Sequence, residues 1–142
     1  MMQALLCTLA PVSYLVGFSF ITFTTFTILG KGLFAGKMFR CSYGAEYPEG
    51  QVECSGLYFE QNLGIAYPRA WHNPPHHFDT FFQASLTIFR IQTLKYVDIM
   101  LDCMDITEIG KSPSTKYSPW NCLFFIICIL IGPIIIMNIF IA

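Results

Sequence analysis

The charged side chains of this 142-residue chain are confined to its middle. All eight Lys and Arg residues and all nine Asp and Glu residues lie between residues 31 and 116, and hydrophobic residues make up 54% of the chain. Such an apolar chain is not disordered, and a net charge of −1 without a basic stripe argues against nucleic-acid binding. The pattern predicts an integral membrane protein with two hydrophobic ends.

Each uncharged end is long enough to cross a bilayer. A helix needs roughly 20 apolar residues to span a hydrocarbon core about 30 Å thick, and residues 4–30 and 119–142 both supply them. We expect the first segment to be a retained helix and not a signal peptide, because no positive charge precedes its long apolar run. In the second, Gly132 and Pro133 predict a bend. Asn138 predicts a protein neighbour, since polar groups in membrane helices face protein.

Two crossings place both chain ends on one side of the membrane and the charged middle on the other. The residues favour neither side consistently. Lys31, Lys37 and Arg40 follow the first helix closely, which favours a cytoplasmic middle. Cys41 and Cys54 lie 13 residues apart in a loop rich in Gly and Pro, and would form a disulfide if that loop faced an oxidising space. Their spacing is not that of a zinc site.

The middle divides into a loop and a helical stretch. Residues 31–77 are predicted to be loop because turn-forming residues recur along them. Residues 78–104 begin with Asp79 as the expected helix N-cap. The apolar stripe of this stretch has helical spacing and comprises Phe78, Phe81, Phe82, Ser85, Leu86 and Phe89. Too short to span, the stretch is expected to enter the membrane and return under the cover of other protein.

No catalytic or metal-binding pattern stands out. His72, His76 and His77 flank two prolines in what we expect to be a solvated turn, since a metal site needs three or four converging ligands. Asp98 and Asp102 lie on one helical face, which indicates a solvated acidic surface. No nucleophile–base set or phosphate-binding glycine loop occurs at usable spacing. We therefore predict no enzymatic activity, no metal and no cofactor.

Several short segments, taken in order, add a further pattern. They are Gly32-Leu-Phe-Ala-Gly-Lys-Met-Phe-Arg-Cys41, Glu53-Cys54-Ser-Gly-Leu-Tyr58, Pro68-Arg-Ala-Trp71, Phe78-Asp79, Asp98-Ile-Met100 with Asp105, and Gly132 with Asn138-Ile-Phe-Ile141. Together they resemble the pore module of one repeat of the voltage-gated sodium and calcium channels, most closely a third repeat. The resemblance implies an all-α integral membrane fold. In it two transmembrane helices (4–30 and 119–142) flank a turret loop (31–77) and a re-entrant pair of pore-type helices (78–104).

The resemblance also places Lys95 at the filter position, which is Lys in third repeats of sodium channels and Glu in calcium channels. The filter-like set that it implies is Thr93, Leu94, Lys95, Tyr96 and Asp98. The family continues with Gly-Trp, whereas this chain has Tyr96-Val97 and one residue fewer. The inner helix is expected to be truncated, since the chain ends at Ala142 where the family continues. The residues alone favour a Lys95 that is solvated at the membrane surface. A lysine inside the membrane would instead indicate a function, because a charge there is costly.

One such module cannot enclose a pore, which needs four around an axis. A homotetramer would place four Lys95 side chains in one ring, where like charges repel and cations are rejected. We therefore expect one quarter of a cation-channel pore, in a heteromeric assembly with other membrane subunits and lipids, passing monovalent or divalent cations across the plasma membrane. The alternative is a non-conducting accessory or scaffold subunit, docked on a larger channel, respiratory or photosynthetic complex in an organelle membrane.

Overall fold

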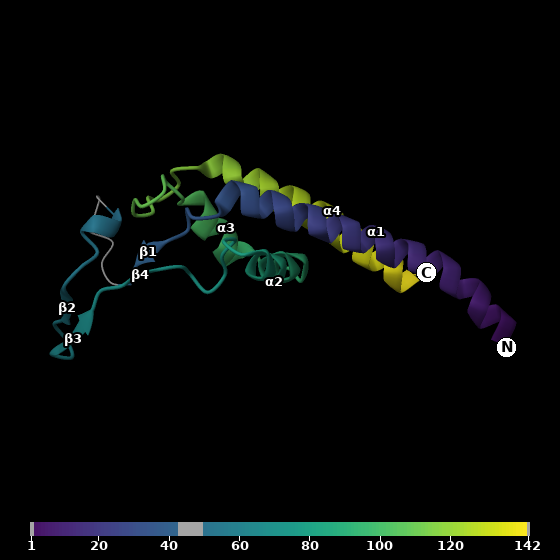
Figure 1. The fold of residues 1–142 in the computed structure, drawn as a ribbon, viewed down its shortest axis with the longest axis horizontal. Coiled ribbons are helices and arrows are strands. Elements are labelled where there is room, and N and C mark those ends of the chain that lie inside the picture. Colours follow the sequence, from purple (N-terminus) through teal and green to yellow (C-terminus); the bar gives the residue numbers. More distant parts are fainter. Residues whose placement is uncertain (1, 43–49, 142) are drawn as a thin grey trace.

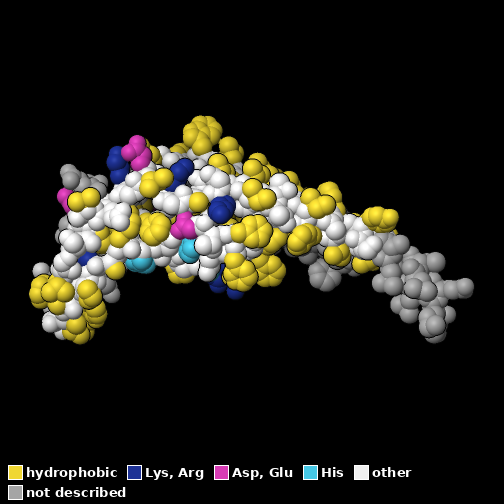
Figure 2. Space-filling view, viewed as in Figure 1, with side chains coloured by type: hydrophobic (Ala, Val, Ile, Leu, Met, Phe, Trp, Pro, Cys, Tyr) yellow, Lys and Arg dark blue, Asp and Glu magenta, His cyan; other side chains and the backbone are white. Residues whose placement is uncertain are grey.

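The structure is a computed structural model that describes the backbone of residues 2–42 and 50–141 and the side chains of residues 11–42 and 50–134. Within these residues the chain forms four α-helices: α1 (Met2–Phe34), α2 (Phe81–Gln92), α3 (Val97–Met104) and α4 (Cys122–Ile141). The helices α1 and α4 run side by side, with both chain ends toward one end of the pair (Figure 1). The loop between α1 and α2 extends from the opposite end, where the charged side chains gather (Figure 2).

The first helix has the length and composition of a membrane crossing. Its segment Pro11–Phe34 has a mean hydropathy of 1.7, and only 11% of its apolar window is buried within the chain. Four threonines satisfy their hydroxyls within the helix, each donating to the carbonyl four residues earlier: Thr22, Thr24, Thr25 and Thr27. In the part of the chain with described side chains, no other helix meets the same criteria, and the apolar stretch Pro119–Ile134 is shorter.

Aromatic rings join α1, α4 and the residue Phe78, just before α2, at one point. The Phe34 ring lies 5.2 Å from Phe78, 5.3 Å from Phe124 and 5.8 Å from Phe125, measured between centroids. Phe34, Phe78 and Phe125 are completely buried. Gly30 makes this approach possible, because a Cβ there would lie 2.7 Å from the Phe78 ring. Close packing of this kind associates helices in lipid, which itself solvates apolar surface.

The start of α2 differs from the prediction. Thr80, and not Asp79, is the N-cap: its hydroxyl accepts a hydrogen bond from the Gln83 amide. The Asp79 carboxylate instead accepts from the Gly36 amide at 2.6 Å and from the Asn73 side chain. It therefore joins the end of α1 to the segment before α2, a long-range role that local helix signals do not reveal.

The residues that α2 buries within this chain are not those of its apolar stripe. The helical period was predicted correctly, but α2 turns its smaller residues and two isoleucines inward, namely Ala84, Thr87, Ile88 and Ile91. Most of the predicted stripe is exposed, with Phe82 at 71% and Phe89 at 59%. Small side chains let helices approach closely within a membrane, so the bulky phenyl groups are left on the outer face.

The predicted loop contains two short antiparallel ladders. The strand β1 (Arg40–Cys41) pairs with β4 (Trp71–His72), and β2 (Leu57–Glu60) pairs with β3 (Ile65–Pro68). These short strands within the loop were not predicted from the sequence. They are too short to show a clear alternation of apolar and polar residues, which is the sequence signal for strands.

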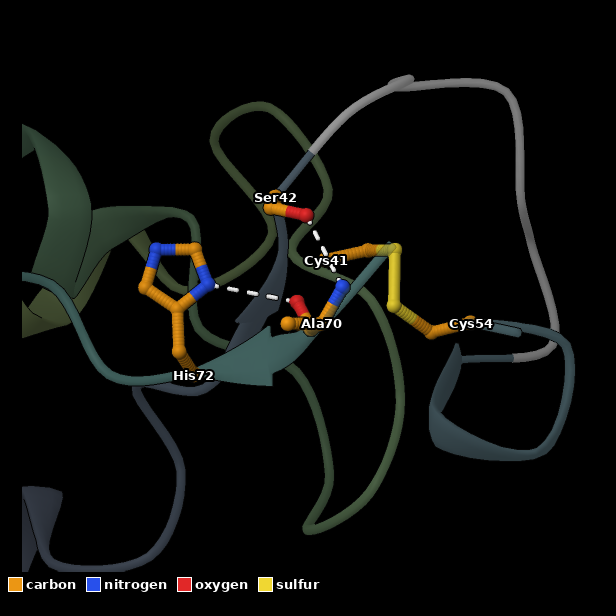
Figure 3. Close-up of a disulfide and its surroundings, with 5 residues drawn as sticks. All are labelled: Cys41, Ser42, Cys54, Ala70 and His72. Atoms are coloured by element: carbon orange, nitrogen blue, oxygen red, sulfur yellow. Dashed lines mark hydrogen bonds between the residues drawn. A yellow bond between two sulfur atoms is a disulfide. The ribbon is translucent and has the colours of Figure 1, made fainter. Parts of the chain in front are cut away.

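A disulfide joins Cys41 to Cys54, as the sequence predicted, with 5.7 Å between the Cα atoms (Figure 3). Next to it, the Ser42 amide donates to the Ala70 carbonyl and the Ala70 amide donates to the Ser42 hydroxyl, both at 2.9 Å. The disulfide therefore anchors the β1–β4 ladder at the base of the loop.

The same loop packs against the segment between α3 and α4. In the short 3₁₀ turn η1 (Gly50–Val52), the Gln51 amide donates to the Gly110 carbonyl at 2.8 Å. Gly50 has a φ of +84°, and a Cβ there would lie 2.1 Å from the Gly110 oxygen. Only glycine fits this contact, both by conformation and by space.

Replacing Cys41 by Ser should loosen the base of the loop. A disulfide closing a loop of this size stabilises by about 3 kcal/mol, chiefly by restricting the open chain. We expect amide hydrogen exchange at Ser42 to become roughly a hundredfold faster. Cys122→Ser, at a half-buried free cysteine, is the matched control and should leave this exchange unchanged. Equal exchange in the two variants would contradict the anchoring role.

Replacing Gly50 by Ala should open the contact with Gly110. The added methyl group meets a backbone oxygen and the φ is left-handed, so we expect a loss of about 2–4 kcal/mol in the free energy of local opening. Hydrogen exchange at the Gln51 amide measures it. Gly64→Ala is the control, since Gly64 has a φ of +63° but nothing within 4 Å of the added Cβ. In that variant the free energy of opening the Gly64 turn should fall by only about 1 kcal/mol. If the two variants lost equal amounts at their own turns, the close contact at Gly50 would contribute nothing.

Candidate functional site

Four of the five predicted filter-like residues, Thr93 to Tyr96, form a tight turn between α2 and α3, and Asp98 lies in the first turn of α3. The Leu94 amide donates to the Ile91 carbonyl and the Lys95 amide donates to the Arg90 carbonyl, both at 3.1 Å. Leu94 lies in the left-handed region, with a φ of 66°. This pair of bonds around a left-handed residue is a Schellman cap, in which that position is normally glycine. The chain thus ends α2 and turns toward α3 within four residues.

Four of the five filter-like residues line one pocket of about 220 Å³. Its lining residues are Leu94, Lys95, Tyr96, Val97, Asp98 and Ile99 from the turn and α3, Arg90 from α2, and His76 from the loop. Thr93 does not line the pocket, and its hydroxyl donates to the Arg90 carbonyl. Lys95 and Asp98 are both exposed. The structure therefore brings together all of the predicted set except Thr93.

Two charged or titratable residues of this pocket were not predicted. Arg90 lies on the last turn of α2, and His76 belongs to the turn that the sequence analysis treated as solvated. Burial, and secondarily the Arg90 charge, lower the pKa of His76. His76 is therefore neutral at neutral pH, and the charged lining consists of Arg90, Lys95 and Asp98. Taken by itself, this lining has more positive than negative charge.

A second charged contact lies behind the turn. Nη1 of Arg40, on β1, is 3.1 Å from Oδ1 of Asp102, on α3, and the two residues are 62 apart in sequence. Burial raises the pKa of Asp102, against the opposing effect of Arg40, and the neighbouring Asp105 and Asp98 raise it further. The sequence analysis treated Asp102 only as part of a solvated acidic face.

The remaining predicted residues lie elsewhere. Gly132 faces α2: a Cβ on it would lie 2.9 Å from Cγ of Gln92. The helix α4 continues through Gly132 and Pro133, while the side chain of Asn138 lies outside the described residues. Cys41 and Cys54 stand in the loop base described above. Among the described residues, no three His, Cys, Asp or Glu side chains are grouped to hold a metal ion.

Comparison with known proteins identifies the family. The family described as "Ion transport protein" matches residues 1–142. The chain is 34% identical over 119 residues to the calcium-channel protein cch1 of Schizosaccharomyces pombe. It is 32% identical over 122 residues to the voltage-dependent calcium channel type A subunit alpha-1 of Apis mellifera, and 31% identical over 123 residues to the L-type subunit alpha-1C of Mus musculus. Each match covers 82% of this chain but 6% of the relative.

These matches confirm the resemblance seen in the sequence. The family is described by ion transport, and all three relatives are named as calcium channels or their subunits. The chain belongs to the ion transport protein family, as an ion-channel pore-like module related to the voltage-gated calcium channels.

Proposed function

We propose that this chain contributes one quarter of a cation-channel pore in a heteromeric assembly. Residues 4–30 and 119–142 cross the membrane, residues 31–77 form the turret, and residues 78–104 form a re-entrant pore-type helix pair. The observation that carries the proposal is the turn between α2 and α3, which presents an exposed Lys95 from a helix pair packed on α1 and α4.

The backbone of the turn supports a re-entrant placement. Irregular backbone is tolerated at membrane depth only where its polar groups are satisfied. Here the Leu94 and Lys95 amides bond to carbonyls of α2, and α2 is covered by α1 on its buried face. The disulfide supports a turret that faces an oxidising space outside the cytoplasm. Such a topology suits a channel of the plasma membrane.

Uncovered apolar surface supports an assembly. The outer face of α2 exposes Phe82 and Phe89. A separate groove of about 480 Å³ is lined by α3, its N-cap and α4, namely Tyr96, Met100, Met104, Cys122, Ile126, Ile129 and Leu130. Contiguous apolar surface of this kind marks contact with lipid or protein. In the proposed channel, lipids and neighbouring pore modules cover it.

The charge at the turn favours neighbours of a different sequence. Four copies of a lining with Arg90 and Lys95 would repel cations, whereas a single lysine among acidic filter residues of other modules leaves a cation site. The relatives are named as calcium channels, which favours cations as the permeating class, monovalent or divalent. An accessory role without conduction gains no support from those relatives.

Lys95→Glu in the assembled channel tests this proposal. The substitution replaces a positive charge, which repels a divalent ion, by a negative charge, which attracts it. At an effective dielectric near 20 this changes the interaction energy with the ion by a few kcal/mol. We therefore expect the permeability ratio of Ca²⁺ to Na⁺, read from reversal potentials, to rise by about tenfold or more.

The matched control is Lys116→Glu, which makes the same charge change in the exposed segment between α3 and α4. It should leave the permeability ratio within about twofold, because Lys116 is exposed to solvent, where salt screens its charge. The proposal fails if Lys95→Glu also leaves the ratio unchanged, or if no partner combination carries current.

Leu94→Gly should stabilise the turn. The left-handed conformation costs a non-glycine residue about 1 kcal/mol, and an exposed Leu94 loses little packing when it is replaced. Thermal unfolding of the detergent-solubilised protein should shift upward, corresponding to about 1 kcal/mol. Thr93→Gly is the comparison, since Thr93 has a φ of −83° and should instead lose about 0.5–1 kcal/mol. A destabilised Leu94→Gly variant would contradict the strained turn.

A further inference from the structure

We propose that Arg40 is a positioning residue for the turn that carries Lys95. Its ion pair with Asp102 ties α3 to the turret, and α3 begins one residue after the turn. The electrical part of this inference rests on the proposed channel function. The structural part does not, and it can be measured without current.

The helix α3 depends on outside contacts for its position. It has eight residues, its N-cap Tyr96 makes no side-chain capping bond, and it buries only Ile99 and Cys103. Helices this short are not stable alone. Its last turn is held toward α4, because the Asn121 side chain donates to the Cys103 carbonyl at 2.7 Å and the Ser118 amide donates to the Met104 carbonyl at 2.8 Å.

Arg40 holds α3 from the turret side. Its backbone is fixed by pairing with His72 across the β1–β4 ladder and by the disulfide of the next residue, Cys41 (Figure 3). The turret also contacts the segment that follows α3, through the bond from the Gln51 amide to the Gly110 carbonyl. The guanidinium of Arg40 therefore extends from a rigid base to the Asp102 carboxylate.

The other side of the turn is equally fixed. Ile88 and Ile91 of α2 are completely buried, so the end of α2 is set by the helix core. Residues 93–96 join this fixed end to α3. Any displacement of α3 relative to α2 must be taken up by these four residues, and Lys95 is one of them. The pair Arg40–Asp102 thus acts on the candidate filter residue through α3.

The exposure of the Arg40–Asp102 ion pair sets the size of the effect that we expect. The two side chains are 40% and 35% exposed, and ion pairs in such surroundings change an equilibrium by about two- to fivefold. Arg40 should therefore adjust the position of Lys95 and not decide whether the module folds.

The structural experiment uses the full chain carrying Lys95→Cys, labelled with an uncharged maleimide so that local charge does not steer the reagent. The chain without Lys95→Cys gives the background from the native thiols. Arg40→Asp or Asp102→Arg should each change the labelling rate by about two- to fivefold. The double swap, Arg40→Asp with Asp102→Arg, should restore the original rate. Failure of the swap to restore it would overturn the inference.

A control pair of the same chemistry is present in the chain. Lys111 and Glu108 lie 2.6 Å apart but only three residues apart in sequence. Their single substitutions, Lys111→Glu and Glu108→Lys, should leave the labelling rate at residue 95 unchanged. Equal effects from the two pairs would show that surface charge alone, and not the tie to the turret, alters the turn.

Reversal potentials in the assembled channel test the functional part. Arg40→Asp should shift the Ca²⁺ to Na⁺ permeability ratio while Lys95 is present, and should have no such effect in the Lys95→Ala background. A shift that persists in Lys95→Ala would show that Arg40 does not act through Lys95. Absence of current in every variant would instead refute the channel proposal, and the labelling cycle would then decide the structural inference.

Discussion

The aromatic contact at Phe34 is the centre of the packing in this module, because it joins α1 to α4 and to Phe78, which leads into α2. Phe34 is completely buried among Phe78, Phe124 and Phe125, and Gly30 removes the side chain that would prevent the contact. Lipid is as apolar as these rings, so burial alone does not drive helices together within a bilayer. Close packing and ring geometry must supply the association. Because Phe78 precedes α2, the same contact aims the end of α2, and with it the turn.

The sequence predicted the helices better than their faces. Hydrophobic length located α1 and α4, and spacing located α2. Which side of α2 is buried could not be read from hydrophobicity, because both of its faces are apolar. Ala84 and Thr87 mark the packed side by their small size, while Phe82 and Phe89 point outward. In membrane helices, residue size is thus a better guide to packing than polarity.

In the candidate site, too, residues that are neighbours in the sequence could be predicted, whereas contacts between residues far apart in the sequence could not. Leu94, Lys95, Tyr96 and Asp98 could be predicted as a set because they are consecutive or nearly so, and the family pattern marks them. His76 could not, because its place in the pocket depends on how the loop between α1 and α2 folds back to the end of α2. The pairing of Arg40 with Asp102 across 62 residues has no sequence signal of its own.

That separation has a consequence for biosynthesis. The loop between α1 and α2 is made early, yet its partners Asp102 and Gly110 are translated about sixty residues later. Contacts of such sequence separation form slowly, since a long chain segment must be brought together first. The disulfide needs only the residues up to Cys54. Covalent closure at the base of the loop therefore requires none of the residues against which the loop docks at the end of synthesis.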